Sequence, residues 1–211
     1  MAGVQAHDWM RVAATQKPVA MRGLTLLWTT DVGSIADIHV YFDVAAVKAQ
    51  LGAAPKGLAP IALAPIPTGP PQFLDQNGRE ADNVRTVRTE LDALENSESM
   101  YLGSLTDDVE VFTLDRTEPA RGAEDARLYF NTMHKAIGEL DTTIVSGWGV
   151  EHFAIVEYWL GGLQWGPLGW IPARRDAVIR LHVVDVNELR DGRIARIWRY
   201  DNPGEIASPG P

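Results

Sequence analysis

Two segments of the chain repeat each other, and this repeat limits the folds that the sequence can adopt. The stretch 33–41 matches 192–200 without a gap, and the same register extends back through the residues before each stretch. A register held across three predicted strands indicates two copies of one structural unit. The identical pairs are Gly33/Gly192, Ile35/Ile194, Ala36/Ala195, Ile38/Ile197 and Tyr41/Tyr200, with Gly3/Gly162, Gln5/Gln164, Ala14/Ala173 and Val19/Val178.

The first copy is incomplete, because nothing in residues 1–52 corresponds to residues 83–160. We therefore divide the chain into a partial module at 1–52, a linker rich in proline and glycine at 53–80, and a complete module at 81–206. A half-sheet alone leaves an apolar face and an edge uncovered. The partial module is expected to pack on the complete one, to exchange with another chain, or to be the remnant of a longer protein. The sequence leaves these three open.

Both modules have the pattern of an α+β fold, in which helices come first and a meander of strands wraps around them. Helices are expected to begin at Asp43, near Asn83 and near Gly122, where polar or acidic residues stand at the helix start. The last of these has an apolar stripe that continues to Leu140, and a short helix is expected around Tyr101. Strands are expected at 23–29, 35–42, 109–112, 142–145, 152–160, 177–187 and 193–200, with a hairpin turn at Asp191-Gly192.

Charge and composition exclude several kinds of function. The formal net charge is −9, which disfavours binding to nucleic acids or to anionic membranes. The chain has no cysteine, so disulfides, thiolate catalysis and cysteine-based zinc sites are excluded. We recognise neither a membrane-spanning segment nor a signal peptide, and a cytoplasmic protein is the expectation.

The segment Gly33-Ser-Ile-Ala-Asp-Ile-His-Val-Tyr-Phe-Asp, followed by Gln50-Leu-Gly, resembles the end of SnoaL-like domains. The complete module resembles these domains along its length, in the helix 83–94, Thr106-Asp-Asp-Val, the helix around Phe130, and Asp191-Gly-Arg-Ile. The SnoaL-like family belongs to the nuclear transport factor 2-like superfamily. The resemblance implies a cone-shaped α+β barrel, also called cystatin-like, with a curved mixed sheet around helices and an internal pocket. It also implies cofactor-free chemistry of the polyketide cyclase or ester cyclase kind.

Cyclases of this family use an aspartate as acid and base, with a histidine on the preceding strand. Asp185 stands at the aspartate position, and Gln164 stands at the histidine position. Glutamine cannot exchange a proton near neutral pH, although it can orient a carbonyl group. In the partial module Leu26 and Gln5 occupy these two positions, so the resemblance implies no such chemistry there.

Strand alternation places Asp185 on one face with three aliphatic residues of 179–183, and His182 on the other face. A carboxyl group on an apolar wall should have a raised pKa, which suits a general acid or base. The alternative is a carboxylate that is hydrogen-bonded near the strand end. Glu157 also lies among apolar residues, and Arg196 or a protonated Asp185 is its expected partner, as part of the site or as a structural ion pair.

Aromatic side chains gather in the second half of the complete module. We expect a hydrophobic ligand pocket lined by these residues, although core packing is the alternative explanation for most of them. The spacing of the histidines indicates no metal site. The expected ligand-binding residues are Trp148, Trp165, Trp170, Trp198, Tyr200 and His182.

Three functions are consistent with the sequence. The first is a cofactor-free cyclase, isomerase or lyase acting on a small hydrophobic carbonyl compound, with Asp185 moving a proton and Gln164 holding the carbonyl oxygen. The second is a module that binds such a ligand without turnover. The third is an oligomerisation module. A homodimer is expected, and exchange of the partial module between the two chains is one form that it could take.

Overall fold

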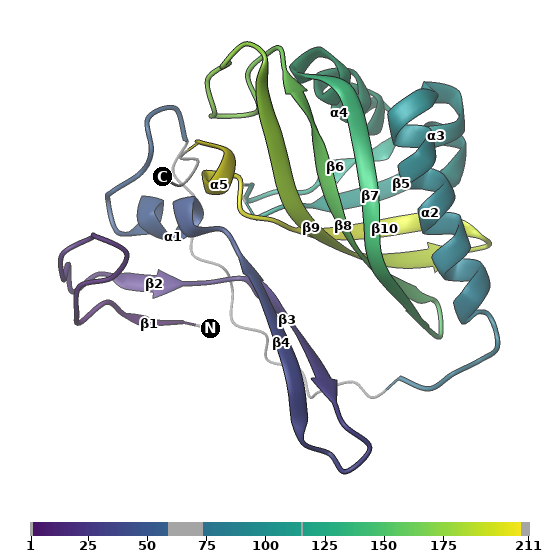
Figure 1. Cartoon of the computed structure of the whole chain (residues 1–211), viewed down its shortest axis with the longest axis horizontal. Helices are drawn as coiled ribbons and strands as arrows, with labels where there is room; N and C mark the ends of the chain where they lie inside the picture. The colour runs from purple at the N-terminus through teal and green to yellow at the C-terminus, as the bar shows by residue number, and fades with distance from the viewer. Residues whose placement is uncertain (1, 59–73, 115, 208–211) are drawn as a thin grey trace.

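The computed structural model describes residues 2–58, 74–114 and 116–207 (Figure 1). Most of the predicted linker, residues 59–73, therefore lies outside the described residues. The partial module contains β1 (Ala2–Val4), β2 (Pro18–Ala20), β3 (Gly23–Thr29), β4 (Ile35–Phe42) and α1 (Val44–Gln50). The complete module contains α2 (Glu80–Asn96), α3 (Glu98–Ser104), β5 (Leu105–Phe112), β6 (Ala120–Arg121), α4 (Gly122–Ala136), β7 (Ile137–Val150), β8 (Phe153–Gln164), β9 (Ala177–Arg190), β10 (Arg193–Tyr200) and α5 (Gly204–Ala207).

The complete module is built on a curved, mixed sheet of six strands in the order β6-β5-β10-β9-β8-β7. Strands β10 and β5 pair in parallel, and the other neighbours pair antiparallel. Helices α2, α3 and α4 pack on one face of this sheet, which we call the inner face, and the hydrophobic core lies between them. This is the α+β fold that the sequence predicts. Among the described residues, no helix is sufficiently long and apolar to cross a bilayer.

The helices follow from apolar residues at helical spacing and from local capping. Helix α2 buries Val87, Leu91 and Leu94 on one side and carries acidic residues in its first turn. Ser97 separates α2 from α3, and its hydroxyl accepts a hydrogen bond from the Met100 amide at the start of α3. This break lets α3 turn and place Tyr101 in the core.

The helix α4 is shorter than its apolar stripe predicted. It ends at Ala136, and Ile137 and Leu140 belong to β7 instead of the helix. The backbone becomes extended at Ile137 (φ −124°, ψ 117°), and the Ala136 carbonyl accepts hydrogen bonds from the amides of Trp165 (2.8 Å) and Gly166 (3.1 Å). Ile137 pairs with Gln164 across the sheet, so the same apolar residue is buried in a strand. Strand β7 is consequently much longer than the predicted segment 142–145.

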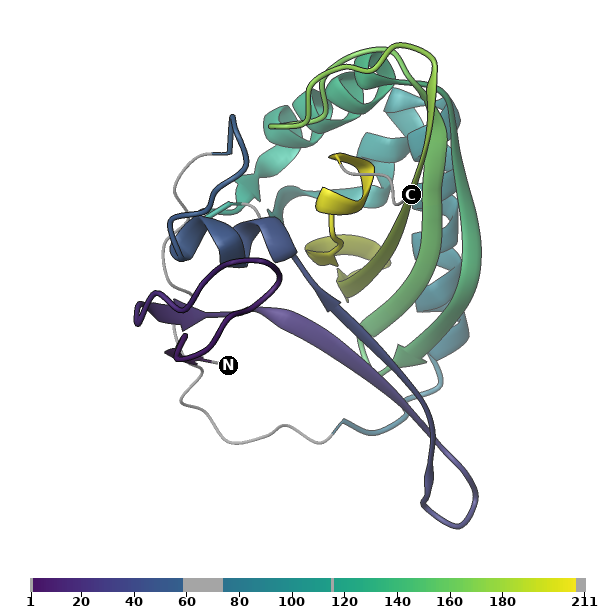
Figure 2. The same cartoon turned by 60° about the vertical axis from the view of Figure 1, so that its left-hand side comes forward.

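The partial module forms two small sheets and one helix. Strands β3 and β4 have the predicted bounds, and they pair as a hairpin from Gly23–Phe42 to Thr29–Ile35. The carboxylate of Asp43 accepts hydrogen bonds from the amides of Ala45 (2.7 Å) and Ala46 (3.1 Å), which fixes the start of α1. The partial module lies beside the sheet, apart from helices α2, α3 and α4, and α1 lies near α5 in both views (Figures 1 and 2).

Candidate functional site

The inner face of the sheet borders a cavity of about 160 Å³. Its walls come from α4, β8, β9, β10, the loop 168–171 and α5. The short helix α5 places Ile206 over the cavity, and the guanidinium of Arg174 holds this helix by a hydrogen bond to the Ile206 carbonyl. Most lining side chains are apolar, and the polar ones are Thr113, Tyr129, Tyr158, Trp170, Arg199 and Asp201.

Asp185 lies on the inner face, as alternation along β9 predicts, and only 1% of its surface is exposed. It stands opposite Arg199 in the β9–β10 register, so the two side chains project together into the same layer. Arg199 Nε is 3.0 Å from Asp185 Oδ1, and Nη2 is 2.6 Å from Oδ2. The Tyr158 hydroxyl donates a further hydrogen bond to Oδ2 at 3.0 Å. The carboxyl that we expected on an apolar wall is therefore an ion-paired, hydrogen-bonded carboxylate.

Arg199 connects Asp185 to the cavity. Its guanidinium donates to the Tyr129 hydroxyl and lies 5.1 Å from the centre of the Tyr129 ring. Burial works against the charged form, but the charge of Asp185 more than compensates and raises the pKa of Arg199 well above its ordinary value. Burial likewise raises the pKa of Tyr129 to about 12 and that of Tyr158 well above 10, so both hydroxyls stay protonated. The cavity wall thus presents a fixed cation and two hydroxyl groups.

Glu90 is a second buried carboxyl group in the same layer. It is 1% exposed, and its Oε1 has no hydrogen-bond partner among the described residues. Burial raises its pKa to about 8, while the charge of Arg199 lowers it and that of Asp185 raises it. Glu90 is therefore mainly a neutral acid at pH 7. Its place three residues after Val87 and four before Leu94 is within the apolar stripe of α2, a sequence signal that we missed.

Gln164 is fully buried, but it does not line the cavity. Its amide nitrogen donates to the carbonyl oxygens of Gly166 and Pro172, both at 3.1 Å, so it braces the β8–β9 connection. This geometry uses the amide donors that would hold a substrate carbonyl. Arg199 and Tyr129 are the donors that reach the cavity, and neither was predicted as a site residue.

The structure separates the predicted ligand-binding residues. Trp170 is the only one of them that lines the inner cavity of the described chain. Trp165 packs over Gly138 and is 53% exposed. The other four, Trp148, Trp198, Tyr200 and His182, are in register with outward-facing residues, so they lie on the opposite, outer face of the sheet. The prediction that these four residues line one pocket together with Trp170 is therefore wrong.

Glu157 also lies on the outer face, where the hairpin β3–β4 covers it. The hydroxyl of Tyr41 donates to Glu157 Oε1, His39 Nδ1 is 2.7 Å from the same oxygen, and Ser146 Oγ is 2.8 Å from Oε2. His182 Nε2 is 3.2 Å from Oε1. The predicted partners, Arg196 and Asp185, are wrong, because Arg196 pairs with Glu110 and Glu188 and Asp185 faces the core.

The electrostatics of this outer cluster favour a charged Glu157. Burial raises the pKa of Glu157, but hydrogen bonds from Tyr41, Ser146 and His39 outweigh it and leave a net lowering. Burial lowers the pKa of His182, whose ring stacks on Trp159 at 4.2 Å between centroids. The cluster therefore docks the partial module on the complete one through hydrogen bonds to a buried carboxylate.

We expect Tyr41→Phe to weaken this docking, because it removes one donor from a buried carboxylate at a cost of about 1–3 kcal/mol. Hydrogen exchange of the β3–β4 amides should accelerate, and urea unfolding should show the loss of stability. Tyr200→Phe is the matched control, since the same change at the equivalent position of β10 removes no hydrogen bond to Glu157. Equal exchange in the two variants would contradict the docking role of Tyr41.

Comparison with known proteins agrees with this architecture. A sequence model of the SnoaL-like domain family matches residues 87–197, which is more than half of the chain. The chain belongs to the SnoaL-like family. None of the curated proteins matches the sequence. The match covers α4, β8 and β9 and ends two residues before Arg199, so it excludes α5 and the partial module.

Solved structures share the fold of this SnoaL-like domain. A candidate SnoaL-like polyketide cyclase from Jannaschia sp. CCS1 has 18% identity and a TM-score of 0.55, over 65% of this chain and 100% of that one. A candidate polyketide cyclase from Silicibacter sp. TM1040 has 21% identity and a TM-score of 0.52, over 64% and 96%. TsrD from Streptomyces laurentii has 19% identity and a TM-score of 0.53, over 60% and 92%. At these identities the likeness shows the fold alone.

Proposed function

We propose that the SnoaL-like domain acts on a small hydrophobic carbonyl compound in the inner cavity, as a cyclase, isomerase or lyase that needs no cofactor. The observation that carries this proposal is the position of Tyr158. Its ring lines the cavity and its hydroxyl is 3.0 Å from Asp185 Oδ2. One side chain therefore connects the space for a substrate to a buried carboxylate.

Recognition of the carbonyl group would fall to Arg199 and Tyr129. Both line the cavity and both carry N–H or O–H donors there. Donors that are already fixed in a site with little water stabilise the negative oxygen that develops when a proton leaves the neighbouring carbon. The apolar side chains of α4, β8 and β9 would hold the hydrocarbon part of the substrate.

Proton transfer would run through Tyr158 to Asp185. The Tyr158 oxygen accepts the proton from the carbon next to the carbonyl, and at the same time its own proton passes to Asp185 Oδ2. The electron pair of the broken C–H bond forms the enolate, whose oxygen is hydrogen-bonded by Arg199 and Tyr129. A concerted transfer avoids a free phenolate, which the raised pKa of Tyr158 disfavours.

Deuterium exchange tests this chemistry before the natural substrate is known. In D2O, the protein should accelerate exchange at the carbon next to the carbonyl of cyclohexanone or acetophenone, measured by proton NMR. Tyr158→Phe should lower the rate by about 100-fold or more, in line with removal of a positioned acid or base. The affinity for the ketone, measured by thermal shift, should change by less than about threefold.

A matched control is available on the same strand. Tyr158 and Trp159 are neighbours, but Trp159 faces outwards and packs on His182, so Trp159→Phe should leave the exchange rate unchanged. Asp185→Asn provides a second test, since asparagine cannot receive the proton. If the natural protein exchanges none of these ketones faster than buffer does, or Tyr158→Phe keeps full activity, the proposed chemistry is wrong.

A second candidate function is ligand binding without turnover. It is favoured by the closed hydrogen bonding of Asp185, whose two oxygens are both engaged, and by the cover that α5 provides over a small cavity. In that case a ketone would raise the melting temperature without any exchange. A homodimer, with or without exchange of the partial module, remains a separate proposal that light scattering tests.

A further inference from the structure

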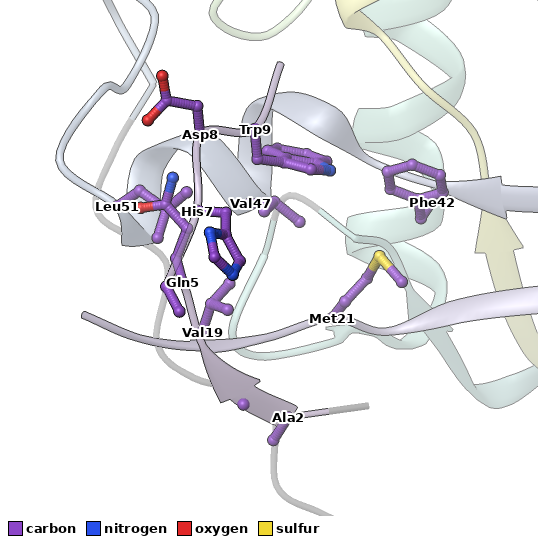
Figure 3. Close-up of a pocket in the computed structure, with 12 residues that line it drawn as sticks. Ala2, Gln5, His7, Asp8, Trp9, Val19, Met21, Phe42, Val47 and Leu51 are labelled. Atoms are coloured by element: carbon purple, nitrogen blue, oxygen red, sulfur yellow. The ribbon is translucent and has the colours of Figure 1, made fainter. Parts of the chain in front are cut away.

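The partial module lines an open hollow of its own, with a volume of about 380 Å³. Figure 3 shows the side chains of Trp9, Phe42, Met21, Val47 and Leu51 around it. The rings of Trp9 and Phe42 are 6.5 Å apart and tilted by 42°, so they form an angled aromatic corner. The hollow is larger than the inner cavity, and most of its lining is apolar.

Hydrogen bonds between two glutamine side chains and the backbone hold the loop and strands around this hollow in place. The side chain of Gln5 is buried, and its Nε2 donates to the carbonyl oxygens of Val12 and Ala13 at 3.1 Å. Its Oε1 accepts from the Thr15 amide at 2.8 Å. Gln50 joins α1 to β2 by two hydrogen bonds to the backbone of Ala20, both 2.8 Å. The side-chain amides of Gln5 and Gln50 therefore have hydrogen-bond partners without a ligand.

The complete module has the same hydrogen-bond arrangement beside the loop 168–171, which lines the inner cavity. Gln164 donates to the carbonyl oxygen of Pro172 just as Gln5 donates to that of Ala13, in the register of the sequence repeat. An isolated bridge joins Leu168 to Ile171, and its counterpart joins Trp9 to Val12.

Helices α1 and α5 each follow the last strand of their module. Each places an aliphatic side chain, Val47 or Ile206, at its hollow. This correspondence supports the repeat. Three lining positions of the two hollows coincide in its register, namely Trp9, Phe42 and Val47 with Leu168, Asp201 and Ile206.

The two hollows differ in what lies opposite the hydrogen-bonded loop and strands. In the complete module, Tyr129 and Met133 of α4 close the cavity from the other side. The described part of the partial module has no such helix, which leaves the larger hollow open. Leu26 stands where the complete module has Asp185, and Val40 stands where it has Arg199.

We infer that the hollow of the partial module is a second, non-catalytic binding site, for an uncharged aromatic molecule. No Lys or Arg side chain lines it among the described residues, and the nearby Lys17 ammonium group is hydrogen-bonded to the Leu51 carbonyl at 3.2 Å. The carboxylate of Asp8 is bound by the Ala14 amide at 3.0 Å, and both Asp8 and His7 lie at the exposed rim. Stacking on the corner of Trp9 and Phe42 selects a flat ring.

Gly3 allows the hollow to be filled by substitution. It lines the hollow, and a side chain added there meets no atom within 4 Å. Gly3→Phe should therefore occupy the binding space without a backbone clash. Gly103→Phe is the matched control, because Gly103 also has open space around it but lies in α3, away from the hollow.

The probe is 2-naphthol, followed through the indole N–H signal of Trp9 in nitrogen-15 NMR spectra of the full chain. Trp9→Phe assigns the signal. We expect a saturable shift with a Kd on the order of 0.1–1 mM, weakened roughly tenfold or more by Gly3→Phe and unchanged by Gly103→Phe. The anion 2-naphthoate should bind more weakly than 2-naphthol.

Three results would overturn the inference: no saturable shift of the Trp9 signal, a Kd that Gly3→Phe leaves unchanged, or tighter binding of 2-naphthoate. A fourth result would overturn it by showing that another protein chain, and not a small molecule, fills the hollow. If light scattering shows a dimer that Gly3→Phe dissociates, a second copy of the chain covers the hollow and the small-molecule site is rejected. A monomer that binds the probe at Trp9 supports the site.

Discussion

Replacement of Arg199 by methionine will destabilise the protein by about 3–5 kcal/mol, because it leaves the carboxylate of Asp185 buried without its cation. Asp185 and Arg199 are 1% and 5% exposed, so water cannot substitute for the lost partner. The Tyr129 hydroxyl loses its contact with the guanidinium at the same time. We expect the change to appear as a lower urea midpoint with a similar m-value.

Arg196→Met is the control for this substitution. Arg196 is on the same strand, but its side chain is 46% exposed where it pairs with Glu110 and Glu188, and such exposed pairs contribute about 0–1 kcal/mol. The double variant Asp185→Leu with Arg199→Met should recover much of the lost stability, because it removes both buried charges. A loss at Arg199 no larger than that at Arg196, or no recovery in the double variant, would contradict the buried pair.

Glu90→Gln will change how stability depends on pH. The pKa of Glu90 rises from 4.5 in an open chain to about 8 in the folded protein. Between these values the folded state keeps a proton that the unfolded state releases. The stability associated with this proton is therefore complete below pH 4.5 and lost as pH rises towards 8. The slope is about 1.4 kcal/mol per pH unit, and the total reaches about 4–5 kcal/mol.

Glutamine keeps the shape of the neutral acid and has no proton to lose, so this contribution to the slope should disappear. The variant should be less dependent on pH between 5 and 8, and more stable than the natural protein at pH 8. Glu98→Gln is the control, since Glu98 pairs with Arg127 at the surface and should leave the slope unchanged. Equal slopes in all three proteins would show that Glu90 is not a neutral acid in the fold. Chemical unfolding at each pH measures the difference.

Sequence patterns predicted the elements whose ends are defined by neighbouring residues. The hairpin β3–β4 has the bounds that alternation and the turn at Gly33 indicate, and Gly33 adopts the left-handed conformation (φ 79°) that the turn requires. The end of α4 was missed because the apolar period runs past it. At the helix end the Ala136 carbonyl accepts the backbone amides of Trp165 and Gly166, which are distant in the sequence, and no local period contains that information.

In the candidate site, too, local patterns predicted the face on which a residue lies but not its distant partners. Alternation along β9 correctly placed Asp185 inside and His182 outside, because the side-chain period of a strand is two. It could not supply Arg199 as the partner, since the register of β10 against β9 contains a bulge between Ile194 and Arg196. The partners of Glu157 were unpredictable for a simpler reason. Two of them, Tyr41 and His39, belong to the partial module, and no local pattern states where that module docks.

The docking of the hairpin has a consequence for synthesis on the ribosome. Tyr41 contacts Glu157, which is 116 residues later in the sequence, and it also contacts His182, which is 141 residues later. At about 5–20 residues per second, the hairpin is translated roughly 6–30 s before the strands that cover it. During that interval Trp28 and Tyr41, which contact Trp148 and Glu157 in the folded protein, face the surroundings of a nascent chain. Chaperone occupancy of residues 23–42 should therefore end only when β9 has emerged from the exit tunnel.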